Sequence, residues 1–328
     1  MRGTVTLPSA SERKFVCAGE TLAMFVPKPG PLAGGFSHDY QLTAAGAETN
    51  VATYLSRLGN SVDWVSRVGS DHAGSFILSY LESEGVGTKD VEVDDHAPTA
   101  VAVKEPSRDG STVRYYRRGS AASKLGPQHV DTILGLSATF VHLTGITAAL
   151  SDTAMEFTEK ALTVLPERAL VSFDVNLRPT LWEKAPAETL LRFALLSETA
   201  FVGLDEAGAL WGCDTPNQVR DLIPRPATLV VKQGPIGATV FRGKNGTFVP
   251  SLEVDVVEPI GAGDAFAAGF LHSHRRGQSP RSAARFGTVL ACASLSSHKD
   301  IGDMPSSAYI RSILQVPDGT WAETRYSR

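Results

Sequence analysis

The most informative part of the chain is Gly261-Ala262-Gly263-Asp264-Ala265-Phe266, which follows the strand-like run Leu252-Glu253-Val254-Asp255-Val256-Val257. Two glycines at the start of an apolar helix allow the backbone to turn its N–H groups toward an anion. Asp264 then falls in the first helical turn, where its carboxylate can reach a group that approaches the anion. An anion site beside a base is what phosphoryl transfer to a hydroxyl requires. A Gly-rich turn with a capping Asp is the simpler interpretation of an isolated G-x-G-D.

The composition is that of an ordinary soluble globular protein. The chain has 328 residues, 42% of them hydrophobic and 20% charged, and a net charge of −4. This length fits one large α/β domain with a small addition. The charge gives no basic footprint for nucleic acid or for an anionic membrane, and no apolar run reaches membrane-spanning length. We therefore expect no nucleic-acid partner and no membrane association.

The cysteines and the two ends of the chain add to this expectation. Cys17, Cys213 and Cys292 are far apart and odd in number, which is neither a disulfide framework nor a metal-ligand spacing. Reduced thiols of this kind predict a cytoplasmic protein. Residues 1–13 lack the apolar centre of a signal peptide and are expected to form an N-terminal extension. Residues 317–328 are expected to form a polar C-terminal tail.

Strand-like runs and helical patterns alternate along most of the chain. Strands are predicted at residues 15–19, 62–68, 139–143, 169–174, 199–202 and 228–232. Helices are predicted at residues 47–58, 73–84, 152–165, 187–196 and 206–211. Strands separated by helices pair in parallel, with helices on both faces of the sheet. The predicted fold class is therefore α/β, with a doubly wound, mostly parallel central sheet.

Two segments, at about residues 22–42 and 91–118, break this alternation. The first is rich in Gly and Pro, and the second has strand-like runs with no helix between them. A small antiparallel sheet built from both would form a β lid over the carboxyl edge of the main sheet; separate surface hairpins are the alternative. A homodimer or higher oligomer through this lid is a further hypothesis, because a small sheet with an exposed apolar face tends to pair with its own copy.

Four motifs, in order, resemble those of the ribokinase-like (PfkB) carbohydrate kinase family. They are Gly46-Ala47-Glu48-Thr49-Asn50, Gly69-Ser70-Asp71-His72-Ala73-Gly74, Lys232-Gln233-Gly234-Pro235-Ile236-Gly237 and Gly261-Ala262-Gly263-Asp264. The resemblance covers roughly residues 15–315 and implies one kinase domain at residues 14–316, with the lid segments inserted in it. It also implies use of ATP and Mg²⁺, with a monovalent cation as a further candidate.

The resemblance implies a role for each matching residue. Asp264 would be the catalytic base, and Gly46 and Asn50 would hold sugar hydroxyls. The backbone that would form the anion hole belongs to Gly261, Ala262 and Gly263. The residues that would bind the nucleotide are Lys232, Gly234, Gly237, Gly261 and Gly263.

Two further stretches bear on the substrate. In the strand-like run at residues 111–116, alternation would place Tyr115 and Arg117 on one face and Tyr116 and Arg118 on the other. Arg178 follows a predicted strand end, where α/β sheets place ligand contacts. Paired guanidinium groups suit a carboxylate. The Tyr-Tyr-Arg strand and the D-x-N-x-R-P loop resemble those of 2-keto-3-deoxygluconate kinases, which implies that Tyr115, Arg117 and Arg178 bind the substrate; surface salt bridges are the alternative.

The chain also departs from the family pattern. Glu258-Pro259-Ile260 stands where many members have D-T-T, and Gly203-Leu204-Asp205-Glu206 has lost the Asn of N-x-x-E. Glu206 is retained and is the metal candidate, acting through water, while Asp205 or a water molecule is the alternative replacement for the lost Asn. Near the usual adenine site, Arg285-Phe286-Gly287-Thr288 lacks an Asn that many relatives have, so the nucleotide preference stays open.

The sequence as a whole predicts an ATP-dependent kinase that phosphorylates the terminal primary hydroxyl of 2-keto-3-deoxygluconate or a close analogue. A neutral-sugar kinase of the fructokinase or ribokinase type is the first alternative. A sugar sensor that keeps the fold without turnover is the second, because fold does not guarantee activity.

Overall fold

The computed structural model describes residues 14–30, 36–107, 110–182, 185–297 and 301–327. The extension predicted at residues 1–13 lies outside this described part. Within the described ranges, no helix combines the length and the apolar character that a bilayer-spanning segment needs.

The main sheet has eight strands in the order β14-β13-β12-β11-β10-β9-β1-β4. Neighbours from β4 to β12 pair in parallel, whereas β13 and β14 add an antiparallel edge. The strands are β1 (Lys14–Ala18), β4 (Ser61–Val65), β9 (Phe140–Thr144), β10 (Leu170–Asp174), β11 (Thr199–Gly203), β12 (Thr228–Lys232), β13 (Gly237–Arg242) and β14 (Asn245–Pro250). The predicted mostly parallel central sheet is confirmed.

Helices cover both faces of this sheet, because successive strand side chains alternate between two buried layers. Phe15 and Cys17 of β1 belong to one hydrophobic core, and Val16 and Ala18 belong to the other. The helices of the first layer include α1 (Ala47–Arg57), α2 (His72–Ser83), α9 (Ala262–His274), α10 (Pro280–Leu295) and α11 (Ser307–Leu314). Those of the second layer include α3 (His129–Gly135), α5 (Asp152–Val164), α6 (Pro186–Leu196), α7 (Leu204–Trp211) and α8 (Pro216–Leu222), with the short α4 (Gly145–Ala148) following β9.

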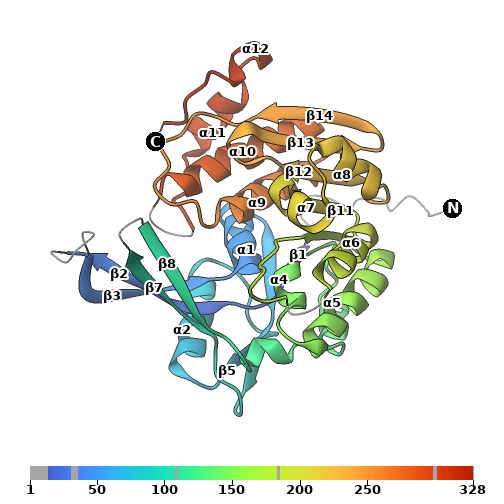
Figure 1. Cartoon of the computed structure of the whole chain (residues 1–328). Helices are drawn as coiled ribbons and strands as arrows, with labels where there is room; N and C mark the ends of the chain where they lie inside the picture. Colours follow the sequence, from blue (N-terminus) through green and yellow to red (C-terminus); the bar gives the residue numbers. More distant parts are fainter. Residues whose placement is uncertain (1–13, 31–35, 108–109, 183–184, 298–300, 328) are drawn as a thin grey trace.

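A second, four-stranded sheet, called the small sheet below, projects at the left of the view in Figure 1. Its order is β3-β2-β7-β8, formed by β2 (Leu22–Pro29), β3 (Phe36–Ala45), β7 (Val101–Ser107) and β8 (Gly110–Tyr116). The predicted lid therefore exists, but the sheet is mixed, since β2 and β7 pair in parallel. The expectation of a fully antiparallel sheet was wrong because the chain crosses the main body between these two strands, which allows them to run the same way.

Two other expectations need correction. The strand predicted at residues 62–68 is interrupted, and its second half, β5 (Arg67–Gly69), leaves the main sheet to pair with β6 (Glu92–Asp94). The predicted polar tail folds onto the body through α12 (Asp318–Trp321). Trp321 is buried there, its Nε1 donates to the Pro250 carbonyl over 2.8 Å, and the Arg285 guanidinium lies 4.2 Å from its ring centroid. Trp321 is thus one anchor of this segment, and Arg325, which pairs with Glu253 and Asp255, is another.

Candidate active site

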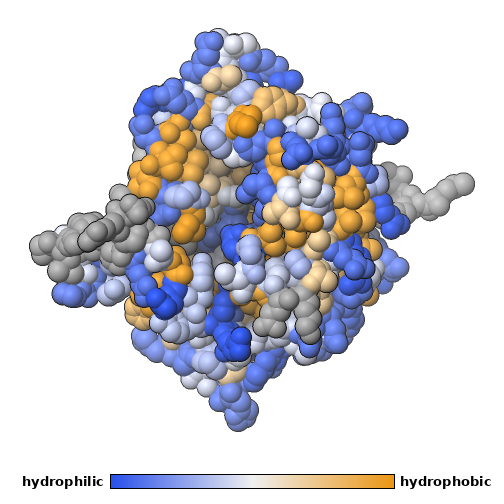
Figure 2. Space-filling model, viewed as in Figure 1, coloured by the Kyte–Doolittle hydropathy of each residue, from blue (hydrophilic) through white to orange (hydrophobic). Residues whose placement is uncertain are grey.

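A cavity of about 650 Å³ lies between the small sheet and the carboxyl edge of the main sheet. Figure 2 shows it as a hollow near the middle of the face in view, with hydrophobic surface on either side. Gly46, Asn50 and Asp264 line it from the body, and Tyr115 and Arg117 line it from the small sheet. The topology has thus brought residues of three separate segments to one place.

The turn at residues 261–264, called the anion turn below, begins α9. Gly261 has φ 83° and ψ −10°, a left-handed conformation that favours glycine. Its carbonyl accepts from the Ala265 N–H over 2.9 Å, which starts the helix. The N–H groups of Ala262, Gly263 and Asp264 precede the first helical hydrogen bond, so they are free to bind an anion together with the positive end of the helix dipole.

Asp264 sits in the first turn of α9 and faces the cavity. Its Oδ2 accepts from the Asn50 side-chain amide over 2.8 Å. Burial raises the pKa of the Asp264 carboxyl to about 7, and the negative charge of Asp174 adds to this, against the Asn50 hydrogen bond and the charges of Lys232 and Arg178. A carboxyl with such a pKa can accept a proton near neutral pH, which is what a general base needs.

Gly46 closes this side of the cavity at the start of α1. A Cβ at position 46 would lie 2.5 Å from the Glu20 carbonyl oxygen and 2.8 Å from the Thr49 hydroxyl. The absence of a side chain therefore allows α1 to begin directly against the segment that follows β1, and so brings Asn50 within reach of Asp264.

Lys232 ends β12 and lies beneath the anion turn. Its Nζ contacts both carboxylate oxygens of Asp174, at 2.7 and 3.0 Å, and would lie 3.7 Å from a Cβ at position 263. Although burial favours the neutral amine, the charges of Asp174 and Glu206 raise the pKa of Lys232. Lys232 is thus a partly buried cation below the turn, and the exposed residues Gly234–Ile236 form the loop beside it. Gly237 follows this loop at the start of β13.

Glu206 braces the start of α7. Its two carboxylate oxygens accept from the Gly203 N–H over 2.6 Å and from the Leu177 N–H over 2.8 Å. Burial raises the pKa of the Glu206 carboxyl, opposed by the charge of Lys232 and reinforced by that of Asp174. The predicted role of Glu206 toward a metal stays a prediction. The structure shows that this carboxylate fixes the backbone at Leu177, the residue directly before Arg178.

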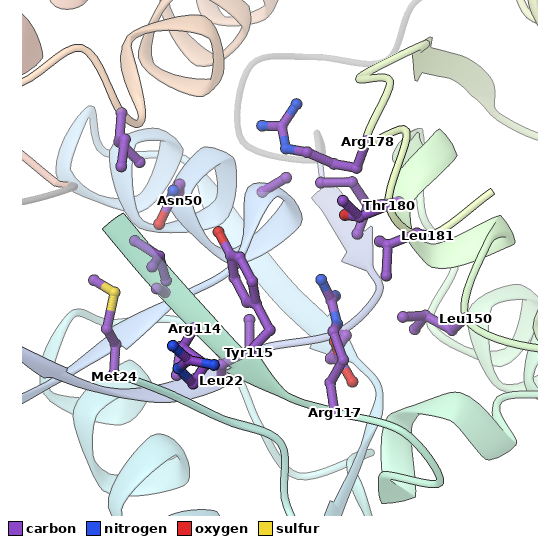
Figure 3. Close-up of a pocket in the computed structure, with 18 of the residues that line it drawn as sticks. Leu22, Met24, Asn50, Arg114, Tyr115, Arg117, Leu150, Arg178, Thr180 and Leu181 are labelled. Carbon is purple, nitrogen blue, oxygen red and sulfur yellow. The ribbon is translucent and has the colours of Figure 1, made fainter. Parts of the chain in front are cut away.

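Arg117 and Arg178 both line the cavity, but their surroundings differ. The Arg117 guanidinium contacts the buried carboxylate of Glu20, with Nε donating to Oε2 over 2.6 Å, and the Ser120 hydroxyl donates to Oε1 of the same carboxylate. Arg178 donates to the carbonyl of its own neighbour Leu177 and forms no ion pair with a carboxylate of the described residues. Figure 3 shows both arginines, with Tyr115 and Asn50, reaching into the space from different elements.

The predicted alternation is seen for the two tyrosines at the end of β8 but not before them, because Thr112, Val113 and Arg114 all line the cavity. Tyr115 lines the cavity, and Tyr116 is 59% exposed. Arg118 was expected on the opposite face from Arg117, but it also lines the cavity. Period-two alternation no longer applies there, because residues 117 and 118 lie beyond the strand.

Proteins similar to this chain identify its family. A family model described as pfkB family carbohydrate kinase matches residues 13–307. The chain is a PfkB family carbohydrate kinase. It is 33% identical to the 2-dehydro-3-deoxygluconokinase of Bacillus subtilis (strain 168), over 92% of this chain and 95% of that protein. It is also 33% identical to the 2-dehydro-3-deoxygluconokinase of Thermoproteus tenax, over 94% and 96%.

Among solved structures, a PfkB protein from Polaromonas sp. JS666 superposes with a TM-score of 0.79 at 30% identity, covering 92% of this chain and 99% of that one. This PfkB kinase is therefore a sugar kinase, a phosphotransferase with a ribokinase-like fold, and its family implies the use of ATP.

The motif at residues 69–74 lies outside its cavity: Asp71 caps α2 by accepting from the Gly74 N–H over 2.8 Å and holds the Thr99 N–H over 2.7 Å, just before β7.

Sequence reasoning missed several residues in and around this candidate site. Glu20 follows the end of β1 and Asp174 ends β10, both at the carboxyl edge of the parallel strands. This placement is the signal that could have identified them. Lys104 and the apolar residues Leu22 and Met24 carry no such signal, because only the folded small sheet brings them over the body.

Proposed function

We propose that this PfkB kinase transfers the γ-phosphoryl group of ATP to the terminal primary hydroxyl of a sugar acid, 2-keto-3-deoxygluconate or a close analogue, and forms its 6-phosphate. The observation that carries this proposal is Arg178, which shares one cavity with Asp264 and has no carboxylate partner among the described residues. A guanidinium left uncompensated beside a sugar site suits a substrate that brings its own carboxylate. The names of the two 33% identical relatives support the same substrate class.

Arg117 has a different part in this proposal. Its charge is already balanced by Glu20, so Arg117 and Tyr115 would shape the wall of the pocket and orient the keto-acid end rather than supply the main attraction. The same pairing is also the observation that favours the alternative, a neutral-sugar kinase, because a balanced Arg117 does not by itself demand an acidic substrate.

The proposed chemistry uses the two groups at the start of α9. Asp264 takes the proton of the attacking hydroxyl, the oxygen bonds to the γ-phosphorus, and ADP leaves. The anion-turn N–H groups stabilise the negative charge on the transferring group without reorganising. Gly46 and Asn50 hold the sugar so that its hydroxyl lies in line with the phosphorus. The Gly234–Ile236 loop, with Lys232 below it, flanks the nucleotide.

A Mg²⁺ ion is part of the proposal as a companion of ATP. The described residues contain no group of three or more His, Cys, Asp or Glu side chains that could hold a metal by themselves. In the proposal, Mg²⁺ therefore arrives bound to the phosphates of ATP and keeps most of its water ligands. Glu206, whose oxygens each accept one N–H and retain a lone pair, is the carboxylate proposed to hold that water shell. Bound Mg²⁺ would neutralise phosphate charge. Dependence on a monovalent cation, oligomerisation through the small sheet and a cytoplasmic location stay predictions.

The test is ADP release by the purified protein with Mg-ATP and, separately, 2-keto-3-deoxygluconate, fructose, ribose and gluconate. We expect turnover on the keto-acid with a specificity constant far above that for the neutral sugars. Preferred turnover of fructose or ribose would replace the sugar-acid assignment with the neutral-sugar alternative. Sugar binding with no turnover on any of the four would favour the sensor.

A further inference from the structure

The ion pair between Lys104 and Glu258 joins the small sheet to the segment that leads into the anion turn. Lys104 lies on β7 and is 7% exposed, and its Nζ contacts Glu258 Oε2. Ala102, two residues earlier, and Val113, its register partner on β8, both line the cavity. Lys104 therefore extends from the cavity face of the small sheet.

Glu258 is attached on its other side to the catalytic half of the molecule. The N–H groups of Val257 and Glu258 both donate to the Leu295 carbonyl at the end of α10, over 2.7 and 3.2 Å. The second carboxylate oxygen, Oε1, lies 3.4 Å from the Ile260 N–H, and Ile260 directly precedes Gly261. One carboxylate thus faces the small sheet through Oε2 and the start of the anion turn through Oε1.

This arrangement differs from the other ion pairs of the small sheet. Arg114 and Glu105 pair within the sheet at exposed positions, and Arg117 pairs with Glu20 beside β1. Lys104 and Glu258 instead connect the cover of the sugar pocket with the loop that carries the base. If the small sheet shifted, the ion pair would either move that loop with it or break. Breaking it would leave the nearly buried Lys104 ammonium without its counter-charge, which is costly.

We propose that Lys104 and Glu258 are positioning residues: their ion pair couples placement of the small sheet over the pocket to placement of the anion turn. The phosphoryl group is then transferred to the sugar hydroxyl when the pocket is covered, and transfer to water is suppressed. The proposal rests on the proposed function for the catalytic role of Asp264, but it does not depend on which sugar is the acceptor.

The experiment compares Lys104→Met, Glu258→Gln and the double variant with the wild type. We expect each single change to lower kcat with the preferred sugar at least about tenfold, because a 1 Å misplacement can cost that much or more. The double variant should lose little more than either single one, as coupled residues do. The ratio of sugar phosphate formed to ADP released should fall below one in the single variants as ATP is hydrolysed by water. Lys14→Met is the matched control, because it also removes a lysine from an ion pair. Lys14 pairs with Asp63 at the amino edge of the main sheet, opposite the carboxyl edge that faces the cavity.

Additive losses in the double variant, or a lower kcat with a product-to-ADP ratio of one, would overturn the proposal and leave a merely structural pair. Amide hydrogen exchange gives a second readout that needs no sugar. Residues 258–265 should exchange faster than in the wild type in Lys104→Met and at the wild-type rate in Lys14→Met. Unchanged exchange in both would also overturn it. If the wild type prefers fructose to the keto-acid, the sugar-acid assignment fails, and the coupling is measured on fructose in the same way.

Discussion

The Asn50 amide donates to Oδ2 of Asp264 over 2.8 Å and so joins α1 to α9 across 214 positions of the chain. The carbonyl oxygen of the same side chain, Oδ1, is buried and has no hydrogen-bond partner among the described residues. It remains available to accept from a sugar hydroxyl. Through one side chain, therefore, the structure can hold the substrate and set the charge state of the proposed base.

The first prediction concerns pH. We expect kcat/KM to rise with pH through a limb near 7, because the pKa of Asp264 is about 7 and only its deprotonated form accepts a proton. Asn50→Ala removes a donor that favours the carboxylate, so the limb should move to higher pH. The measurement is a pH profile of kcat/KM for both proteins. A limb near 4 in the wild type would contradict the raised pKa of Asp264, because 4 is close to the ordinary value of an Asp carboxyl.

The second prediction concerns Asp264→Asn. Loss of the base should lower turnover at least about a hundredfold. The same change should stabilise the fold at pH 8, because the pKa of Asp264 is raised from 3.8 to about 7. The folded state then binds this proton more tightly than the unfolded state, so the free energy of unfolding falls between about pH 4 and 7. Asp264→Asn avoids that loss, up to about 4 kcal/mol. Urea unfolding at pH 8 and at pH 4 measures it; equal effects at the two pH values would contradict this account.

Much of this architecture could be predicted from the sequence. Runs such as residues 228–232, apolar and β-branched between turn residues, have the same bounds as β12. Gly261 and Asp264 could be singled out as candidate residues because the pattern that marks them is local, a few residues long. Motif order then placed Asn50 in the same site.

Partners that depend on tertiary structure could not be predicted. Nothing local to Arg117 shows that Glu20, 97 positions earlier, neutralises it. Likewise, nothing in the polar segment after residue 315 shows that Trp321 will find a buried position against Arg285. The parallel pairing of β2 with β7 also depends on the path of the chain between them rather than on either strand.

The third prediction tests the role proposed for Arg178, which differs from that of Arg117. Arg178→Ala should raise the KM for the sugar acid about tenfold or more, since hydrogen bonds between charged groups contribute about 1.5–3 kcal/mol each. Turnover of neutral sugars and the KM for ATP should change little. Steady-state kinetics with both substrates varied provides the measurement. A rise confined to the KM for ATP would reassign Arg178 to the phosphates.

The fourth prediction concerns the buried partner of Arg117. Arg117→Ala leaves the Glu20 carboxylate, 1% exposed, without its counter-charge and should destabilise the fold by about 3–5 kcal/mol. Arg117→Ala combined with Glu20→Gln should recover much of that loss, because the uncompensated charge is then gone. Thermal and urea unfolding of the wild type and these two variants provide the measurement. No recovery in the double variant would mean that the packing of Arg117, and not its charge, supports the site.

The fifth prediction compares two glycines that share a left-handed backbone conformation, one at the candidate site and one away from it. Gly261 has φ 83° and begins the anion turn, whereas Gly277 has φ 76° in an exposed turn where a Cβ would meet no atom within 4 Å. Alanine at either position should cost about 1–2 kcal/mol of stability, because a Cβ disfavours the left-handed conformation. Gly261→Ala should also lower kcat at least about tenfold, since relief of that strain would turn N–H groups away from the phosphoryl group, where each donor is worth about 10²–10³ in rate. Gly277→Ala should keep its kcat. Equal kcat values in the two variants, at equal stability loss, would mean that the Gly261 conformation starts the helix without contributing to an anion hole.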